Sequence, residues 1–73
     1  MTAPAETGQV TVNGDLMEIP HRTTIGALLE RLDVRPARVV VELNGTIYKR
    51  GEGLEQEIAA GDVVEIVHFV GGG

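Results

Sequence analysis

The residues of this 73-residue sequence with the clearest chemical potential are the last five, Phe69-Val70-Gly71-Gly72-Gly73. From Ile66 onward no side chain carries a formal charge if His68 is neutral, and the final three residues have no side chain at all. Glycine adds minimal bulk and adopts any backbone angle, and three extended residues reach roughly 10 Å. Such a tail can thread a narrow channel and place a terminal carboxylate in the active site of another protein.

A carboxylate is a poor electrophile, so the terminal carboxylate needs activation before it can react. Adenylation supplies a good leaving group, and the acyl adenylate then accepts sulfur or another nucleophile. In that scheme this chain provides the acyl group and a partner enzyme provides the catalytic residues. The alternative is a frayed chain end, because terminal residues are often poorly ordered. The functional interpretation is favoured because the tail continues a predicted strand without a linker.

The rest of the sequence offers no catalytic constellation. Ser and Cys are both absent, and the threonines have no plausible paired base. Gly51-Glu52-Gly53 is too short for a phosphate-binding loop and lacks the strand–loop–helix context that such loops need. The nearby carboxylates, Glu52, Glu55 and Glu57, are typical of a solvated charged run. We therefore expect that the protein is not an enzyme and binds no cofactor itself.

Composition argues against several other kinds of ligand. Six basic residues against eleven acidic ones give a net charge of −5, which opposes binding to nucleic-acid phosphates. His21 and His68 lack the spacing of paired metal ligands, so no metal site is expected. Without a signal peptide or an apolar run of membrane-spanning length, we expect no membrane contact and a cytoplasmic location. Lys49-Arg50 is interpreted as ordinary surface, with contact to an acidic rim left open.

The elements that must position the tail begin with a predicted β-hairpin. Residues 1–8 are interpreted as a flexible leader. Alternating side chains predict strands at 9–12 and 16–19, separated by Asn13-Gly14. Asn-Gly is the strongest short hairpin signal, because both residues tolerate positive φ.

An amphipathic helix follows the hairpin. Thr24 is the favoured N-cap, and Pro36 requires the helix to end by about Val34, because a residue before proline disfavours helical backbone angles. The apolar residues recur with helical spacing at Ile25, Leu28, Leu29 and Leu32. The helix is therefore expected to cover one face of a sheet.

Three more strands are predicted in the second half of the chain. Residues 39–43 and 46–50 flank a second Asn-Gly turn, and residues 63–70 form the longest apolar strand. Residues 51–60 are predicted to be a loop that can include one helical turn, anchored by Leu54 and Ile58. The order of strand, strand, helix and three further strands describes a β-grasp, the ubiquitin-like architecture. The predicted fold class is thus α+β, with a mixed sheet of four to five strands and one helix packed on one face.

Alternation also sorts the strand residues between the two faces of the sheet. The side predicted to meet the helix carries Val10, Val12, Met17, Ile19, Val39, Val41, Leu43, Val64 and Ile66. The open side is predicted to carry Thr11, Leu16, Glu18, Val40, Glu42, Glu65, Val67 and Phe69. A contiguous apolar patch of Leu16, Val67 and Phe69 beside the tail would suggest a partner-docking surface. The β-grasp domain is expected to span residues 9–70, with the glycine tail at 71–73.

Taken together, these segments resemble the ThiS-type sulfur carrier proteins of bacterial thiamine biosynthesis. The resemblance covers about Val10 to Gly73. Each segment alone is weak evidence for the family, but the order of the segments and the chain length make the combination specific. The matching segments are Val10-Thr11-Val12-Asn13-Gly14, Thr23-Thr24-Ile25 with Leu28-Leu29, Val41-Glu42-Leu43-Asn44-Gly45, Gly61-Asp62-Val63-Val64-Glu65-Ile66-Val67 and Val70-Gly71-Gly72-Gly73.

The resemblance implies a role for the tail and a set of partners. Gly73 would be the acyl carrier, and Gly72 would keep the approach to it unobstructed; Gly71 precedes this diglycine. A ThiF-like adenylyltransferase would use MgATP to adenylate Gly73. A persulfide sulfur from a cysteine desulfurase or another donor would then form a thiocarboxylate, which would give its sulfur to thiazole synthase.

Two alternatives stay open at this stage. The same fold, tail and activation chemistry would serve a sulfur carrier for molybdopterin synthesis or for tRNA thiolation. A protein of another class, a ubiquitin-like binding module or modifier, would use the same surface without sulfur transfer. The single lysine, Lys49, makes chain building on itself unattractive.

Overall fold

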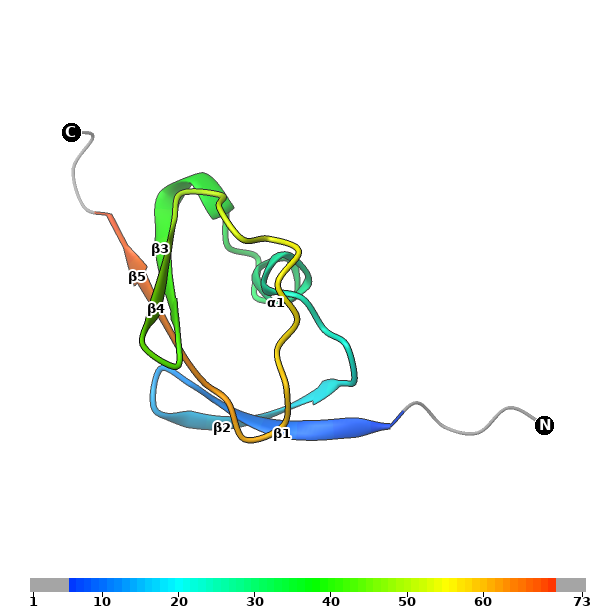
Figure 1. Ribbon diagram of the computed structural model, residues 1–73. Coiled ribbons are helices and arrows are strands. Elements are labelled where there is room, and N and C mark those ends of the chain that lie inside the picture. Colours follow the sequence, from blue (N-terminus) through cyan, green and yellow to red (C-terminus); the bar gives the residue numbers. More distant parts are fainter. Residues whose placement is uncertain (1–5, 70–73) are drawn as a thin grey trace.

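The computed structural model describes residues 6–69, which fold into one five-stranded mixed sheet and one α-helix (Figure 1). The helix α1 spans Ile25–Arg31, and a short 3-10 helix, η1, spans Pro36–Arg38. The strands are β1 Thr7–Val12, β2 Asp15–Pro20, β3 Val39–Leu43, β4 Thr46–Lys49 and β5 Val63–His68. In space they follow the order β2-β1-β5-β3-β4, with β1 and β5 parallel and the other neighbours antiparallel. This arrangement confirms the predicted β-grasp.

The sheet curls around α1 and buries one apolar layer against it (Figure 1). Every residue predicted to face the helix is buried in this layer except Met17, which is partly buried and packs against it. The predicted open-face residues are all exposed or half-buried. The buried layer consists of Val10, Val12, Ile19, Ile25, Leu28, Leu29, Val39, Val41, Leu43, Ile58, Val64 and Ile66.

The first strand begins two residues earlier than predicted. Thr7 pairs with Pro20 and Gly8 with Ile19, so both residues assigned to the leader from sequence belong to the sheet. Gly8 is required there, because a Cβ at this position would lie 2.8 Å from the Cβ of Ala60. A close approach between backbones from distant parts of the chain leaves no local sequence signal. The remainder of the predicted leader, residues 1–5, lies outside the described residues.

The helix starts as predicted but ends three residues early. The Thr24 hydroxyl caps it by accepting a 3.1 Å hydrogen bond from the N–H of Ala27. Asp33 then takes a left-handed conformation, with φ of 59°. Its N–H donates to the carbonyl of Glu30, and the next N–H donates to the carbonyl of Leu29. This Schellman arrangement ends the helix at Arg31, and it was missed because glycine usually occupies the left-handed position.

Residues 51–62 pass along α1 and satisfy its first backbone N–H groups. Ile25 donates to the carbonyl of Gln56 at 2.9 Å, and Gly26 donates to the carbonyl of Leu54 at 3.0 Å. These groups have no partner within a helix, so carbonyls from this segment replace water. Leu54 is partly buried and Ile58 is buried, which confirms both predicted anchors.

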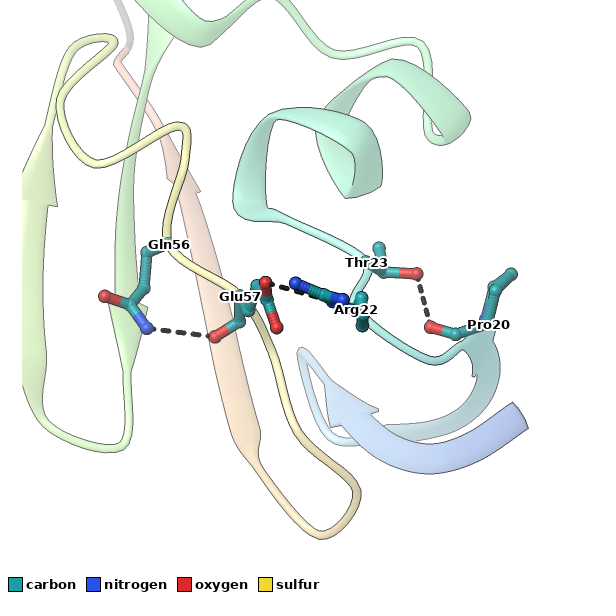
Figure 2. Close-up of polar contacts among 5 residues, drawn as sticks. All are labelled: Pro20, Arg22, Thr23, Gln56 and Glu57. Atoms are coloured by element: carbon teal, nitrogen blue, oxygen red, sulfur yellow. Dashed lines mark hydrogen bonds and ion pairs between the residues drawn. The ribbon is translucent and has the colours of Figure 1, made fainter. Parts of the chain in front are cut away.

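Polar side chains join the same segment to the connection between β2 and α1 (Figure 2). The Thr23 hydroxyl donates a 2.6 Å hydrogen bond to the carbonyl of Pro20. Arg22 Nε donates to the Glu57 carboxylate at 3.4 Å, and the Gln56 amide donates to the carbonyl of Glu57 at 3.1 Å. The Arg22–Glu57 pair is well exposed, so it contributes little to stability.

Candidate functional site

The candidate site is the end of β5, where the chain leaves the sheet toward its carboxyl terminus (Figure 1). β5 pairs with β3 from Val64 opposite Leu43 to His68 opposite Val39. The N–H of Phe69 extends this ladder by donating a 3.0 Å hydrogen bond to the carbonyl of Arg38. The chain is therefore held by the sheet up to Phe69. Val70, predicted to end the strand, and the tail Gly71, Gly72 and Gly73 lie outside the described residues.

On its other side β5 pairs with β1, and this pairing is much shorter. The parallel ladder with β1 contains only Thr11 opposite Val63 and Val12 opposite Val64. Beyond it, the side-chain oxygen of Asn13 accepts a 2.7 Å hydrogen bond from the N–H of Ile66. The second half of β5 thus extends past β1 along β3, and Phe69 lies at the corner of the sheet where this half ends.

The three predicted docking residues are all exposed, but the structure brings only two of them together. Phe69 is 44% exposed and Val67 is 58% exposed, and both lie on the open face at the tail end of β5. Leu16 is 69% exposed and pairs with Thr11, which pairs with Val63 at the start of β5. The strand from Val63 to Phe69 is roughly 20 Å long. Leu16 is therefore not part of a patch beside the tail.

Two features near the tail end of β5 were not predicted from the sequence. Ile47 on β4 is 58% exposed and pairs with Glu42, so it extends the apolar part of the open face. The cross-strand pairing that reveals it could have been inferred from the Asn-Gly turn between β3 and β4. The Arg50 guanidinium also lies 4.6 Å from the centroid of the Phe69 ring, which is cation–π geometry. Sequence alone gave no signal for that contact.

Two hollows lie near the site. One, of about 380 Å³, lies at the root of the tail and is lined by Asp33, Val34, Arg35, Arg38, His68 and Phe69. The other, of about 430 Å³, lies beside α1 and is lined by Gly26, Glu30, Asp33, Val34, Arg35, Pro36 and Leu54. Within residues 6–69, no three His, Asp or Glu side chains are grouped to hold a metal ion.

No helix in the described part of the chain is both long and apolar enough to cross a membrane.

Comparison with known proteins identifies the chain. A model of the ThiS family matches residues 10–73, which is nearly the whole sequence and includes the carboxyl-terminal glycines. The chain belongs to the ThiS family. A ThiS protein is expected to show the β-grasp architecture described above, and the solved structures bear this out.

Two structures of a ThiS protein from Geobacter metallireducens, described as a thiamine biosynthesis protein, resemble this chain. The crystal structure is 35% identical, covers 89% of this chain and 99% of its own, and superposes with a TM-score of 0.72. The NMR solution structure is also 35% identical, covers 89% of this chain and 87% of its own, and has a TM-score of 0.67. Their likeness confirms the fold of this ThiS-family chain.

The chain also resembles one part of a much longer protein. The thiazole synthase of Magnetococcus marinus is 34% identical over 65 residues, which cover 89% of this chain. This chain spans only 20% of that protein. Together with the ThiS structures, family membership supports the role of a small sulfur carrier protein.

Proposed function

We propose that this chain carries sulfur on the carboxylate of Gly73 for formation of the thiazole ring of thiamine. A ThiF-like adenylyltransferase joins the carboxylate to the α-phosphorus of ATP with Mg²⁺ bound, and pyrophosphate leaves. A persulfide, supplied by a cysteine desulfurase or another donor, attacks the acyl carbon and AMP leaves. A thiol then cleaves the S–S bond, which leaves a thiocarboxylate on Gly73 and a disulfide on the donor. Thiazole synthase receives the sulfur.

The observation that carries this proposal is that the ThiS-family match runs through Gly73. The geometry of β5 supports it, because the sheet holds the chain up to Phe69 and residues 70–73 lead from there to Gly73. Because this segment is short, docking fixes few backbone angles, and three of its four residues add no side chain to the channel. The chain needs no catalytic residue of its own, because the partner supplies the chemistry.

The relative from Magnetococcus marinus supports thiazole synthase as a partner. A segment of 65 residues similar to this chain occurs within a protein named thiazole synthase, and it makes up about a fifth of that protein. Covalent linkage of a carrier domain to the enzyme it serves would give it a high effective concentration. We propose the same pairing of carrier and synthase for this chain.

The proposed docking surface is the tail end of the open face. Val67 and Phe69 lie next to each other on the outer side of β5, and Val40 pairs with Val67 on β3. An enzyme that accepts the tail must come close to this corner, so it can bury these apolar groups at the same time. Leu16 lies about 20 Å away and would be contacted only by a partner that covers the whole sheet.

Reconstitution of thiazole formation tests the function. Thiazole synthase, its carbon and nitrogen substrates, the adenylyltransferase, MgATP and a persulfide donor are combined with the chain or with a variant lacking Gly73. Thiazole phosphate should form only with the intact chain. Equal product with the shortened chain, or without any chain, would contradict the proposal.

A further inference from the structure

We propose that four basic residues at the root of the tail form a docking collar for an acidic rim on the partner. The collar consists of Arg35, Arg38, Lys49 and Arg50. Its proposed partner surface is a ring of Asp and Glu side chains around the entrance to the channel that receives the tail. The inference rests on the proposed function, because it assumes that the tail enters such a channel.

Three arginines of the collar lie around the end of β5. The carbonyl of Arg38 accepts the hydrogen bond from the N–H of Phe69, so Arg38 is fixed beside the point where the tail begins. The Arg50 guanidinium lies over the face of the Phe69 ring. Arg35 and Arg38 line the 380 Å³ hollow together with His68 and Phe69. Residues from η1, β5 and the segments beside them therefore bring three arginine residues to one corner.

Lys49 completes the collar on the open face. It pairs with Val40, which in turn pairs with Val67 on β5. Residues paired across neighbouring strands project from the same side of a sheet. The ammonium group of Lys49 thus projects on the same side as the exposed Val67, and the collar borders the apolar docking surface.

The collar charges are available to a partner. All four residues are exposed, and the ion pairs within residues 6–69 do not involve any of them. Four acidic residues lie nearby. Asp33 lines the same hollow, and the Glu52 carboxylate accepts a hydrogen bond from the backbone N–H of Lys49. Glu42 and Glu65 pair with each other on the open face, two residues further from the tail than Val40 and Val67. From the Val40–Val67 pair to Phe69, the four basic residues therefore outnumber Asp33 and Glu52, and the part of the corner nearest the tail keeps a positive excess.

This positive corner stands out because the chain is acidic. Four of the six basic residues belong to the collar and four of the eleven acidic residues lie near it, whereas the remaining two basic residues are accompanied by seven acidic ones. Such an uneven charge distribution orients a protein as it approaches a complementary surface and raises the rate of productive encounters. An acidic rim would attract the tail end of the molecule and repel the remainder.

The length of the tail indicates which part of the partner meets the collar. Residues 70–73 would span at most about 14 Å if fully extended. When the Gly73 carboxylate reaches the reacting centre, the collar remains at the channel entrance. The matching charges therefore belong to the protein surface around the entrance rather than to the phosphates of the nucleotide.

Association kinetics test the collar separately from sulfur transfer. The rate constant for binding of the chain to a fluorophore-labelled ThiF-type adenylyltransferase is measured by stopped flow at about 25 mM and about 500 mM NaCl. The test variant is Arg38→Gln/Arg50→Gln. The control, Arg22→Gln/Arg31→Gln, removes the same formal charge outside the collar. Circular dichroism checks that both variants fold.

The collar predicts that the test variant associates about 10-fold more slowly than the unchanged chain at low salt, with most of the difference lost at high salt. The control should stay within about 2-fold of the unchanged chain. Equal slowing by both variants, or no slowing by the test variant, would overturn the proposal.

A selective rise in the KM for ATP with an unchanged association rate would also overturn it, since the collar would then serve the nucleotide. If the unchanged chain binds but gains no sulfur, the proposed function fails while the association rates still decide the collar.

Discussion

Phe69 is tied to Arg38 by a 3.0 Å hydrogen bond from its backbone N–H to the arginine carbonyl. This bond adds one pair to the β3–β5 ladder beyond Val39 and His68. The sheet therefore holds the exposed residues Val67 and Phe69 in place. The collar residues lie around the same end of the sheet, where the tail begins. A partner that binds the open face at this end therefore also contacts Phe69, the last described residue before the tail.

Phe69→Asp should weaken binding to the adenylyltransferase by at least about 10-fold, which corresponds to about 1.4 kcal/mol. The substitution removes an apolar contact and the ring beneath the Arg50 guanidinium. Because Phe69 is 44% exposed, the free energy of unfolding should change by less than the binding free energy. Isothermal titration calorimetry and urea unfolding measure the two quantities.

Leu16→Asp is the matched comparison for Phe69→Asp. Leu16 is an exposed apolar residue on the same face, but it lies at the other end of β5 from the tail. Its replacement should change binding by less than about 2-fold. If Leu16→Asp weakens binding as much as Phe69→Asp, the docking surface is not confined to the tail end.

Asn13→Gly should destabilise the domain by about 1–2 kcal/mol. Glycine accommodates the φ of 49° but removes the oxygen that accepts the hydrogen bond from the N–H of Ile66. Asn13→Asp keeps an oxygen at that position and tolerates the left-handed conformation, so it should retain most of the stability. Urea unfolding of the two variants is the measurement, and equal stability of Asn13→Gly and the unchanged chain would contradict the bridging role.

Gly53→Ala should be more destabilising than Gly51→Ala. Both glycines have positive φ, of 64° and 80°, so each alanine incurs strain of about 1–2 kcal/mol. A Cβ at Gly53 would also collide with the ring of Tyr48, which packs against the core, whereas one at Gly51 meets open space. Overpacking adds about 1–3 kcal/mol. Thermal unfolding that ranks the two variants equally would count against the Tyr48 contact.

Deletion of Gly73 should leave the domain folded. The buried hydrophobic layer is built from residues that lie between Val10 and Ile66. The free energy of unfolding should therefore stay within about 0.5 kcal/mol of the value for the unchanged chain. Chemical denaturation measures it, and a larger loss would mean that the tail also contributes to the fold, so that lost activity could not be assigned to chemistry alone.

The parts of this fold that depend on local chemistry could be predicted from sequence. The two Asn-Gly pairs adopt positive φ and form the two hairpin turns, and the Thr24 cap begins the helix. Alternating side chains assigned Val67 and Phe69 correctly to the exposed side of the sheet. Each of these features is explained by residues that are close together in the sequence.

Features that depend on contacts between distant segments could not be predicted in the same way. The position of Leu16 relative to Phe69 follows from the parallel register between β1 and β5, which no turn connects directly. The early start of β1 depends on the space between Gly8 and Ala60. The Arg50–Phe69 contact requires the ends of β4 and β5 to meet at one corner. Each of these is set by tertiary pairing rather than by local preference.

Intact-mass analysis after alkylation tests the central claim most directly. The chain is incubated with the adenylyltransferase, MgATP and a persulfide donor, separated from the other proteins and treated with iodoacetamide. Because it contains no Cys, a sulfur on the carboxyl terminus is the expected site of rapid alkylation. The alkylation step also distinguishes sulfur gain from oxidation of Met1 or Met17, which changes the mass by a similar amount.

The expected product carries one sulfur in place of one oxygen and one alkyl group, and fragmentation assigns both to Gly73. Omission of ATP or deletion of Gly73 should abolish it. An unmodified terminus on a folded chain, with an adenylyltransferase and donor that load another carrier, would contradict the assignment of Gly73 as the sulfur carrier.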